Sequence, residues 1–285
     1  MSRAAVPTRE DDAKSYAEIR AGGLRVACLG RNELKALMVR ECREARMRTQ
    51  KTPKLVFAAN GHAISLAARD SEFRRFHEVA DLIHADGQPV VFASRLLART
   101  PIPERSATTD FFHDAAEAAC RHGLRFFLLG ATEEVNAACA ERMRVLHPGL
   151  QIAGRRHGYF RREDEARICA EINAAKPDVL WVGLGLPLEQ AFCVRNRDRL
   201  SAGWMVTAGG CFNFVAGNYA RAPEWMQRTG FEWLHRLAHE PRRLFGRYAL
   251  TNPHALFLLL TRTSALEQPM SLRAKAAMHA ESPAG

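Results

Sequence analysis

The sequence has no long hydrophobic run and no secretory signal, and both absences restrict its relation to membranes. Its longest apolar run near the C-terminus, 255–260, is far shorter than the roughly 20 residues that cross a membrane as a helix. The first 20 residues carry charges where a signal peptide has an apolar stretch. We therefore expect a soluble or peripherally membrane-associated protein.

Cysteine motifs and metal-binding motifs are also missing. The seven cysteines are an odd number, are widely spread and include no Cys-x-x-Cys pair. This pattern excludes a disulfide framework and a zinc finger and favours free thiols in a reducing cytoplasm. The chain contains no Asp-x-Asp pair to hold a divalent ion, and we expect no metal and no other cofactor.

Lysine is scarce, yet the chain is strongly basic. Lys and Arg number 41 against 31 Asp and Glu, which gives a net charge of +10, and only six of the 41 are Lys. The excess suggests an anionic partner, namely nucleic acid, a phosphorylated small molecule or a lipid headgroup surface, although genomic composition can account for part of it. The sequence lacks the basic helix-turn-helix, zinc site or aromatic and basic strands of nucleic-acid-binding proteins. We therefore expect no nucleic-acid partner.

Apolar strands and helices alternate along most of the 285 residues, a length that allows one large domain or two small ones. Such strands, ending in Gly or a polar residue, are typical of a parallel α/β sheet buried on both faces. Ligands of these sheets bind at the carboxyl ends of the strands. The expected strands are 55–60, 82–87, 125–130, 150–154, 179–185 and 204–210, and the expected helices are 33–48, 70–80, 109–122, 132–147, 164–175 and 189–196.

Changes in composition divide the chain into four segments. Residues 1–50 form a polar segment followed by a helix, and 51–217 form the α/β core. Residues 218–263 form a basic helical appendage, and 264–285 form a flexible tail. Within the core, Thr108 or Thr109 is expected to cap one helix and Thr132 another.

Glycines follow several of the expected strands and suggest a nucleotide site. They allow a close approach of the backbone to a phosphate near helix N-termini, although each alone could serve a tight turn. Neither Gly-x-Gly-x-x-Gly after the first strand nor a Walker A motif is present, which counts against NAD-dependent and P-loop enzymes. A nucleotide-binding or NAD-binding α/β protein of another activity remains the alternative. The glycines are Gly130, Gly183, Gly185, Gly209 and Gly210.

A row of arginines lies in the appendage. Arg236, Glu240, Arg243 and Arg247 are spaced i, i+4, i+7 and i+11. If one helix continued through Pro241 with a kink, this row would lie beside an apolar stripe and suit an anionic membrane interface. A helix packed on its own domain with a solvated arginine edge fits the spacing equally well.

An ordered set of motifs between about residues 55 and 250 resembles the WecG/TagA/CpsF family of bacterial glycosyltransferases. Its most specific parts are Arg-Ala-Pro, Glu-Trp-Leu and Glu-Pro-x-Arg. In order, the motifs are Asn60, Asp86-Gly87, Glu104-Arg105 with Asp110, Leu129-Gly130, Gly158-Tyr159-Phe160, Asn173 with Pro177-Asp178, Gly183-Leu184-Gly185-Leu186-Pro187, Gly209-Gly210 with Phe212-Asn213-Phe214 and Gly217, Arg221-Ala222-Pro223, Glu232-Trp233-Leu234-His235-Arg236 and Glu240-Pro241-Arg242-Arg243.

The resemblance implies an inverting, metal-independent transfer of a sugar from a UDP donor to a polyprenyl-pyrophosphate-linked saccharide at the inner face of the plasma membrane, for cell-surface or exopolysaccharide synthesis. Donors of the N-acetylmannosamine, N-acetylmannosaminuronic acid, glucose and glucuronic acid types are all implied. It also implies a Rossmann-like core, and an appendage that closes over the site and contacts the anionic membrane surface. Deleting the chain from Arg221 onward should then abolish membrane association and activity.

The resemblance assigns the base to Asp86. It places Arg105 near the donor phosphates, Tyr159 at the nucleotide, and Arg236, Arg243 and Arg247 at the membrane or lipid pyrophosphate. The remaining substrate-binding residues that it implies are Asn60, Asp110, Gly130, Gly183, Gly185, Glu189, Gln190, Gly210 and Asn213.

The chain departs from the family pattern at three places. Ala58 stands where a Thr is usual. The usual Pro-x-Gln-Glu is here Pro-x-Glu-Gln, ending in Glu189 and Gln190, which leaves open which of the two faces the donor. Asn213 replaces an Asp and can hydrogen-bond a uracil edge without a charge.

The expected chemistry is also coherent without the family. Inverting transfer needs a carboxylate that accepts the acceptor's hydroxyl proton and a group that stabilises the departing diphosphate. Without a metal, that stabilisation falls to Arg105, to helix N-termini after the glycine turns and to arginines of the appendage.

Overall fold

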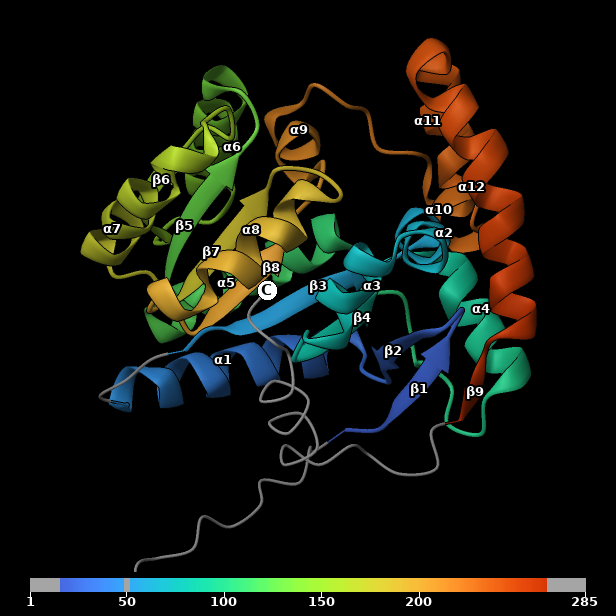
Figure 1. The fold of residues 1–285 in the computed structure, drawn as a ribbon. Helices are drawn as coiled ribbons and strands as arrows, with labels where there is room; N and C mark the ends of the chain where they lie inside the picture. The colour runs from blue at the N-terminus through green and yellow to red at the C-terminus, as the bar shows by residue number, and fades with distance from the viewer. Residues whose placement is uncertain (1–15, 49–51, 266–285) are drawn as a thin grey trace, which may run out of the picture.

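A large parallel sheet organises the protein in the computed structural model, which describes residues 16–48 and 52–265 (Figure 1). Its six strands run in the order β4-β3-β8-β7-β5-β6, and every neighbouring pair is parallel. This confirms the expected α/β class. The strands are β3 Lys54–Ala59, β4 Leu82–Ala85, β5 Arg125–Gly130, β6 Gln151–Arg156, β7 Val179–Gly183 and β8 Trp204–Thr207.

Helices cover both faces of this sheet and form two hydrophobic cores. The alternation of side chains along a strand sends Phe57 into one core and Val56 into the other. The first core packs against α2 Gly61–Arg69, α3 Ser71–Glu78, α4 Gln88–Leu97, α7 Glu165–Ala175 and α8 Leu188–Asn196. The second packs against α1 Arg31–Met47, α5 Thr108–His122, α6 Glu133–Leu146 and α9 Cys211–Ala216. Two short 3₁₀ helices, η1 Arg162–Asp164 and η2 Arg197–Arg199, complete this part.

A small antiparallel sheet in the order β2-β1-β9 lies beside the large one, and the sequence did not predict it. Strands β1, Glu18–Ala21, and β2, Leu24–Ala27, form a hairpin. Gly22 and Gly23 close it in left-handed conformations, with φ of 58° and 96°. Strand β9, Ser264–Ala265, pairs with β1, so the start of the expected tail is a strand. Residues 1–15 and 266–285 of the expected terminal segments lie outside the described residues.

Two local predictions in the core need correction. Helix α2 follows β3 directly and was not expected. Asn60 caps it by accepting a hydrogen bond from the Ala63 amide at 3.0 Å. Neither Thr108 nor Thr109 caps α5, whose N-cap is Ala107 without a side-chain bond. Thr132 does cap α6, as predicted.

The appendage consists of α10 Glu224–Thr229, α11 Glu232–His239 and α12 Pro241–Thr261. Helix α11 ends before Pro241, because Glu240 adopts a non-helical conformation between the two helices. The continuous helix through Pro241, on which one of the two interpretations of the arginine row depended, is therefore absent between 232 and 261, and the row is divided between α11 and α12. Helix α12 buries Ala255, Leu258 and Leu259 against the first core and stands beside α2 (Figure 1). Within residues 16–48 and 52–265, no helix is long and apolar enough to span a membrane.

Candidate active site

A cavity of about 1220 Å³ opens at the carboxyl ends of the central strands. The loops after β3, β4, β7 and β8 form one side, and α11 and α12 form the other. Most of the predicted site residues therefore meet in one place, as the topology of a parallel sheet requires. Those that line the cavity are Asn60, Asp86, Arg105, Tyr159, Gly183, Gly185, Glu189, Gln190, Gly210, Asn213, Arg236 and Arg247.

Asp86 follows β4 and is held by hydrogen bonds to both carboxylate oxygens. Oδ1 accepts from the backbone amide of Thr108 at 2.8 Å, and Oδ2 accepts from Nδ2 of Asn60 at 3.0 Å. Burial alone would raise the pKa of this carboxyl, but the Arg105 charge and these two hydrogen bonds outweigh it and lower the pKa. Asp86 is therefore an oriented carboxylate at neutral pH. By accepting the hydrogen bond from the Thr108 amide, Asp86 also satisfies the start of α5, where a threonine cap was expected.

Arg105 lies next to Asp86 and is engaged from two sides. Its Nε donates to the backbone oxygen of Asp86 at 2.7 Å. Its Nη2 donates to the Glu232 carboxylate of α11, also at 2.7 Å. Both partners of this ion pair are largely buried. The cation expected to meet the donor phosphates is thus paired with an acid of the appendage.

Glu189 is a second buried carboxylate in the cavity wall. Its Oε2 accepts from the backbone amides of Gly185 and Gly209 at 3.1 and 3.0 Å, so it joins the loops after β7 and β8. Burial raises the pKa of Glu189 to about 7, although these hydrogen bonds act in the opposite direction. Gln190 beside it is also buried, and its Oε1 has no hydrogen-bond partner among the described residues. Both side chains line the cavity, and the free acceptor belongs to Gln190.

Arginines of the appendage also reach the cavity. Arg236 on α11 stacks over the ring of Phe214 on α9, with Cζ 5.1 Å from the ring centre. Arg247 on α12 lies over the ring of Tyr248, and its buried Nε has no hydrogen-bond partner among the described residues. Both arginines line the cavity. The side chain of Arg243 lies outside the described residues.

Two predicted site residues lie outside the cavity lining. Asp110 on α5 pairs with Arg221 of the appendage at 2.8 Å. Gly130 ends β5 with φ of 141°, and a Cβ there would lie 2.2 Å from the Gly183 oxygen. Its lack of a side chain thus permits the close approach of β5 to β7. Tyr159 does line the cavity and is 74% exposed, so its ring is free to meet a ligand.

Several cavity residues received no role from the sequence. Glu232 was visible within a motif, but nothing in the sequence of the basic appendage indicated that this acid would pair with Arg105. Burial and the charge of Arg247 lower the pKa of His62 to about 4, so its ring is neutral. Thr207 ends β8 with a buried hydroxyl that has no partner among the described residues. The one sequence signal for Thr207 is its position near the end of a predicted strand, where ligands of parallel sheets bind.

Comparisons with known proteins identify the family of the chain. The model of the "Glycosyl transferase WecG/TagA/CpsF family" matches residues 19–268. A protein of Bacillus spizizenii is 33% identical over 190 residues, which cover 67% of this chain and 72% of the relative. One of Bacillus subtilis is 30% identical over 207 residues, which cover 71% and 80%. One of Staphylococcus aureus is 28% identical over 189 residues, which cover 66% and 73%.

All three relatives are named N-acetylglucosaminyldiphosphoundecaprenol N-acetyl-beta-D-mannosaminyltransferase. The match favours glycosyl transfer over the NAD-binding alternative, and it covers both the strand-end residues and the appendage. The chain therefore belongs to the WecG/TagA/CpsF family of bacterial glycosyltransferases, enzymes of lipid-linked polysaccharide synthesis.

Proposed function

We propose that the protein transfers N-acetylmannosamine from a UDP donor to N-acetylglucosamine on a polyprenyl diphosphate, with inversion at the anomeric carbon. The observation that carries this proposal is the ionised Asp86, which lines the cavity beside Arg105 and is held by Asn60 and the Thr108 amide. The names of the relatives supply the two sugars and the lipid diphosphate.

Asp86 is the base in this mechanism. The acceptor hydroxyl attacks the anomeric carbon of the donor sugar while its proton passes to a carboxylate oxygen of Asp86. The hydrogen bonds from Asn60 and Thr108 fix the carboxylate, so little reorganisation is needed when the proton moves. One displacement on the face opposite the leaving group inverts the anomeric centre.

The departing UDP takes the electron pair of the broken bond. Arg105 stabilises the growing negative charge of the diphosphate, because a guanidinium matches phosphate oxygens in two parallel hydrogen bonds. The glycine loop at Gly183 and Gly185 lets the donor approach the backbone closely. Asn213 and Tyr159 are available to the uracil and ribose end.

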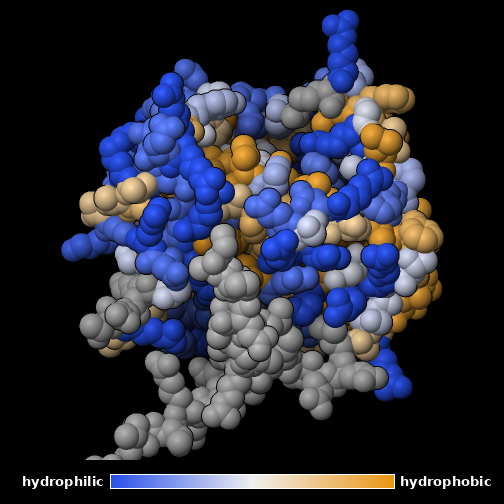
Figure 2. Space-filling view, viewed as in Figure 1, coloured by the Kyte–Doolittle hydropathy of each residue, from blue (hydrophilic) through white to orange (hydrophobic). Residues whose placement is uncertain are grey.

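The acceptor enters from the side of the appendage. Arg236 and Arg247 face the cavity and supply positive charge for its diphosphate. Hydrophobic residues gather along the right-hand edge of Figure 2, where Figure 1 places α12. Leu250 and Phe257, which share a face of this helix, are each at least 60% exposed. Such a face suits peripheral association with the anionic inner surface of the plasma membrane, where a polyprenyl carrier resides.

The test is a transfer assay with the full chain and a short-chain lipid diphosphate carrying N-acetylglucosamine. The donors are UDP-linked N-acetylmannosamine, its uronic acid, glucose and glucuronic acid, and the product is read by mass. We expect a product with UDP-N-acetylmannosamine. No product with any donor, or a product with another donor alone, would overturn the proposal. Thermal shift provides an independent control, because UDP should stabilise the protein and NAD should not.

A further inference from the structure

A second cavity, of about 610 Å³, lies between the β1–β2 hairpin, helices α2 and α3 and the end of α12. We call it the hairpin cavity. It shares no lining residue with the candidate active site, and the proposed transfer reaction leaves it unexplained. Its described lining consists of Arg20, Gly22, Gly23, Leu24, Arg25, Ala67, Ala68, Arg74, His77, Glu78, Thr261, Arg262, Thr263 and Ser264.

Positive charge dominates this lining. Four arginines face one acid, and Arg74 is paired with that acid, Glu78, at 3.8 Å. Arg25 lies 3.9 Å from a carboxylate oxygen of Glu18. Arg20 and Arg262 form no ion pair with any carboxylate of the described residues, and the one hydrogen bond seen for the Arg20 side chain goes to the Gly23 oxygen at 3.2 Å. Two guanidinium groups from distant parts of the chain are therefore available to an anion.

His77 adds a specific requirement. The side chain is 2% exposed and packs between the rings of Phe57 and Phe73. Its Nδ1 lies 3.1 Å from the Phe73 oxygen, which can only accept, so Nδ1 carries the hydrogen. Burial lowers the pKa of His77 to about 4, so the ring is neutral. Nε2 is then an acceptor without a partner among the described residues, and it needs a hydroxyl or amine donor.

Exposed apolar side chains stand beside the cavity. Thr261 lines it at the end of α12, and Phe257 lies one turn earlier on the same face. Phe257 is 60% exposed and Leu260 is 52% exposed. A ligand with an anionic group and an apolar tail would therefore be complementary to this region. The arginines would bind the anion, and Phe257 and Leu260 would contact the tail.

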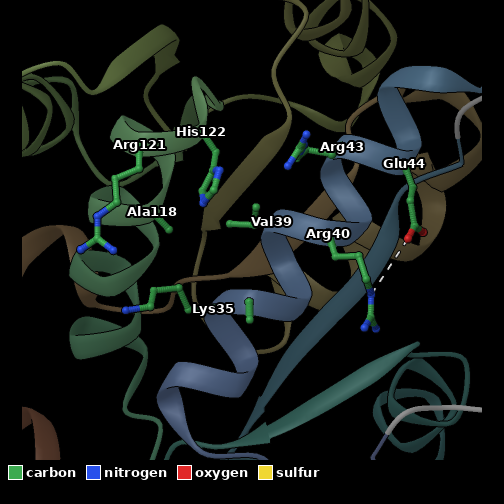
Figure 3. A pocket seen from close by; sticks show the side chains of 9 residues that line it. Lys35, Val39, Arg40, Arg43, Glu44, Ala118, Arg121 and His122 are labelled. Atoms are coloured by element: carbon green, nitrogen blue, oxygen red, sulfur yellow. Dashed lines mark ion pairs between the residues drawn. The ribbon is translucent and has the colours of Figure 1, made fainter.

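A basic groove between α1 and α5 shows what distinguishes the hairpin cavity (Figure 3). The groove also gathers cations, but Arg40 is paired with Glu44 and Lys35 with Glu117. No buried polar atom lacking a partner belongs to its lining. The cations of this groove therefore resemble those of an ordinary solvated surface. Substitutions in the groove serve as a matched control for substitutions in the hairpin cavity.

We propose that the hairpin cavity binds the headgroup of an anionic phospholipid that bears a free hydroxyl, of the phosphatidylglycerol type. The phosphodiester meets Arg20 and Arg262, the hydroxyl donates to Nε2 of His77, and the acyl chains follow Phe257 and Leu260 into the bilayer. This inference rests on the membrane association proposed above and extends it from a general apolar face to a lipid-specific site.

The first test measures sedimentation with vesicles of phosphatidylglycerol and phosphatidylcholine. The double variant Arg20→Gln/Arg262→Gln should bind at least about tenfold more weakly than the wild type, since each basic residue at a membrane surface contributes roughly fivefold in affinity. The control Arg40→Gln/Arg43→Gln removes the same charge from the groove in Figure 3 and should bind like the wild type. Equal weakening in both variants, or no binding by the wild type, overturns the proposal.

The second test addresses the hydroxyl and the source of the phosphate. The wild type should prefer phosphatidylglycerol to phosphatidylmethanol, which has the same charge and no hydroxyl, and His77→Phe should lose this preference while keeping the aromatic packing. Equal binding of the two lipids by the wild type contradicts the assignment. Free glycerol phosphate should not compete with vesicles, and competition would identify a soluble ligand instead.

Failure of this site can be distinguished from failure of the transferase. Arg20 and Arg262 lie outside the active-site cavity. The double variant should therefore turn over a short-chain acceptor in solution at the wild-type rate. Loss of vesicle binding with full turnover in solution supports the lipid site, whereas loss of both would show that the substitutions damage the whole enzyme and would overturn the assignment.

Discussion

The carboxylate of Glu232 lies 2.7 Å from the guanidinium of Arg105. One residue belongs to the appendage and the other to the α/β core, 127 positions apart in the sequence. Because Arg105 is the cation proposed to stabilise the leaving diphosphate, a donor must compete with Glu232 for it. Donor binding and the position of α11 are therefore linked through one ion pair.

The first prediction concerns this competition. Glu232→Gln removes the competing carboxylate, so the KM for the UDP donor should fall by about 3–10-fold while Arg105 stays in place. The thermal midpoint should fall as well, because a largely buried ion pair loses one partner. Steady-state kinetics and thermal unfolding measure the two effects.

The control is Glu224→Gln. That carboxylate pairs with Arg228 on an exposed surface of α10, and its loss should leave the KM for the donor unchanged. A rise in the donor KM of the Glu232 variant would show that Glu232 helps to bind the donor, and the competition model would then be wrong.

The second prediction concerns the base. Asp86→Asn should reduce turnover by about 10²–10⁴-fold, because an amide cannot accept the proton of the acceptor hydroxyl. Binding of UDP, measured by calorimetry, should remain close to the wild-type value. Asp198→Asn on the exposed helix η2 is the matched control. Full activity of the Asp86 variant would remove this residue from the base role.

The third prediction concerns pH. The pKa of Glu189 is raised to about 7 by burial, so the folded state holds this proton more tightly than the unfolded state, where the ordinary value is 4.5. The contribution of Glu189 to stability is therefore greatest below pH 4.5 and is lost as the pH rises towards 7. We expect the free energy of unfolding, measured by chemical denaturation, to change less between pH 5 and pH 8 for Glu189→Gln than for the wild type. Glu163→Gln on exposed η1 should behave like the wild type, and an unchanged pH dependence in the Glu189 variant would contradict the raised pKa.

The fourth prediction concerns the membrane-facing side of α12. Replacing Leu250 and Phe257, which lie on one face of α12, by Ser should weaken binding to anionic vesicles by about tenfold, because each exposed side chain buries apolar area in the bilayer. Truncation from Arg221 is a poorer test, since it would also uncover the first core where Ala255 and Leu258 pack. Val145→Ser/Leu146→Ser on α6 changes exposed apolar residues elsewhere and should leave binding unaltered.

The fifth prediction concerns the second ion pair between the core and the appendage. Arg221 lies 2.8 Å from Asp110, and both side chains are partly exposed. A double-mutant cycle with Asp110→Asn and Arg221→Gln should give a coupling of about 0.5–1 kcal/mol. Both variants should also increase the rate of proteolysis within 218–223. Additive effects on stability would show that the pair does not hold the appendage.

Sequence patterns located the site well because strand ends are local features. A run such as 179–183 is apolar at every position, and a parallel strand buried on both faces requires that pattern. The polar or glycine residue after each run then falls at the same edge of the sheet, so Asp86, Gly183 and Gly210 could be grouped before their contacts were known.

The arginine row of the appendage and the strand pairing near the two ends of the chain were harder to predict. An arginine spacing across Pro241 fits a continuous helix, but Glu240 leaves the helical conformation, and α12 packs back against α11 through the rings of Trp233 and Tyr248. Strand β9 pairs with β1 across nearly the whole chain, and no local periodicity encodes such a pairing.

The sequence by itself determined the α/β class, the strands of the large sheet, the family and most residues of the candidate site, because periodicity and motif order are local properties of the chain. Only the tertiary structure decided the strand order, the pairing of Arg105 with Glu232 and the assembly of the hairpin cavity. These features join residues that are far apart in sequence. Their formation depends on how the packed layers bring distant charges together, which no local pattern specifies.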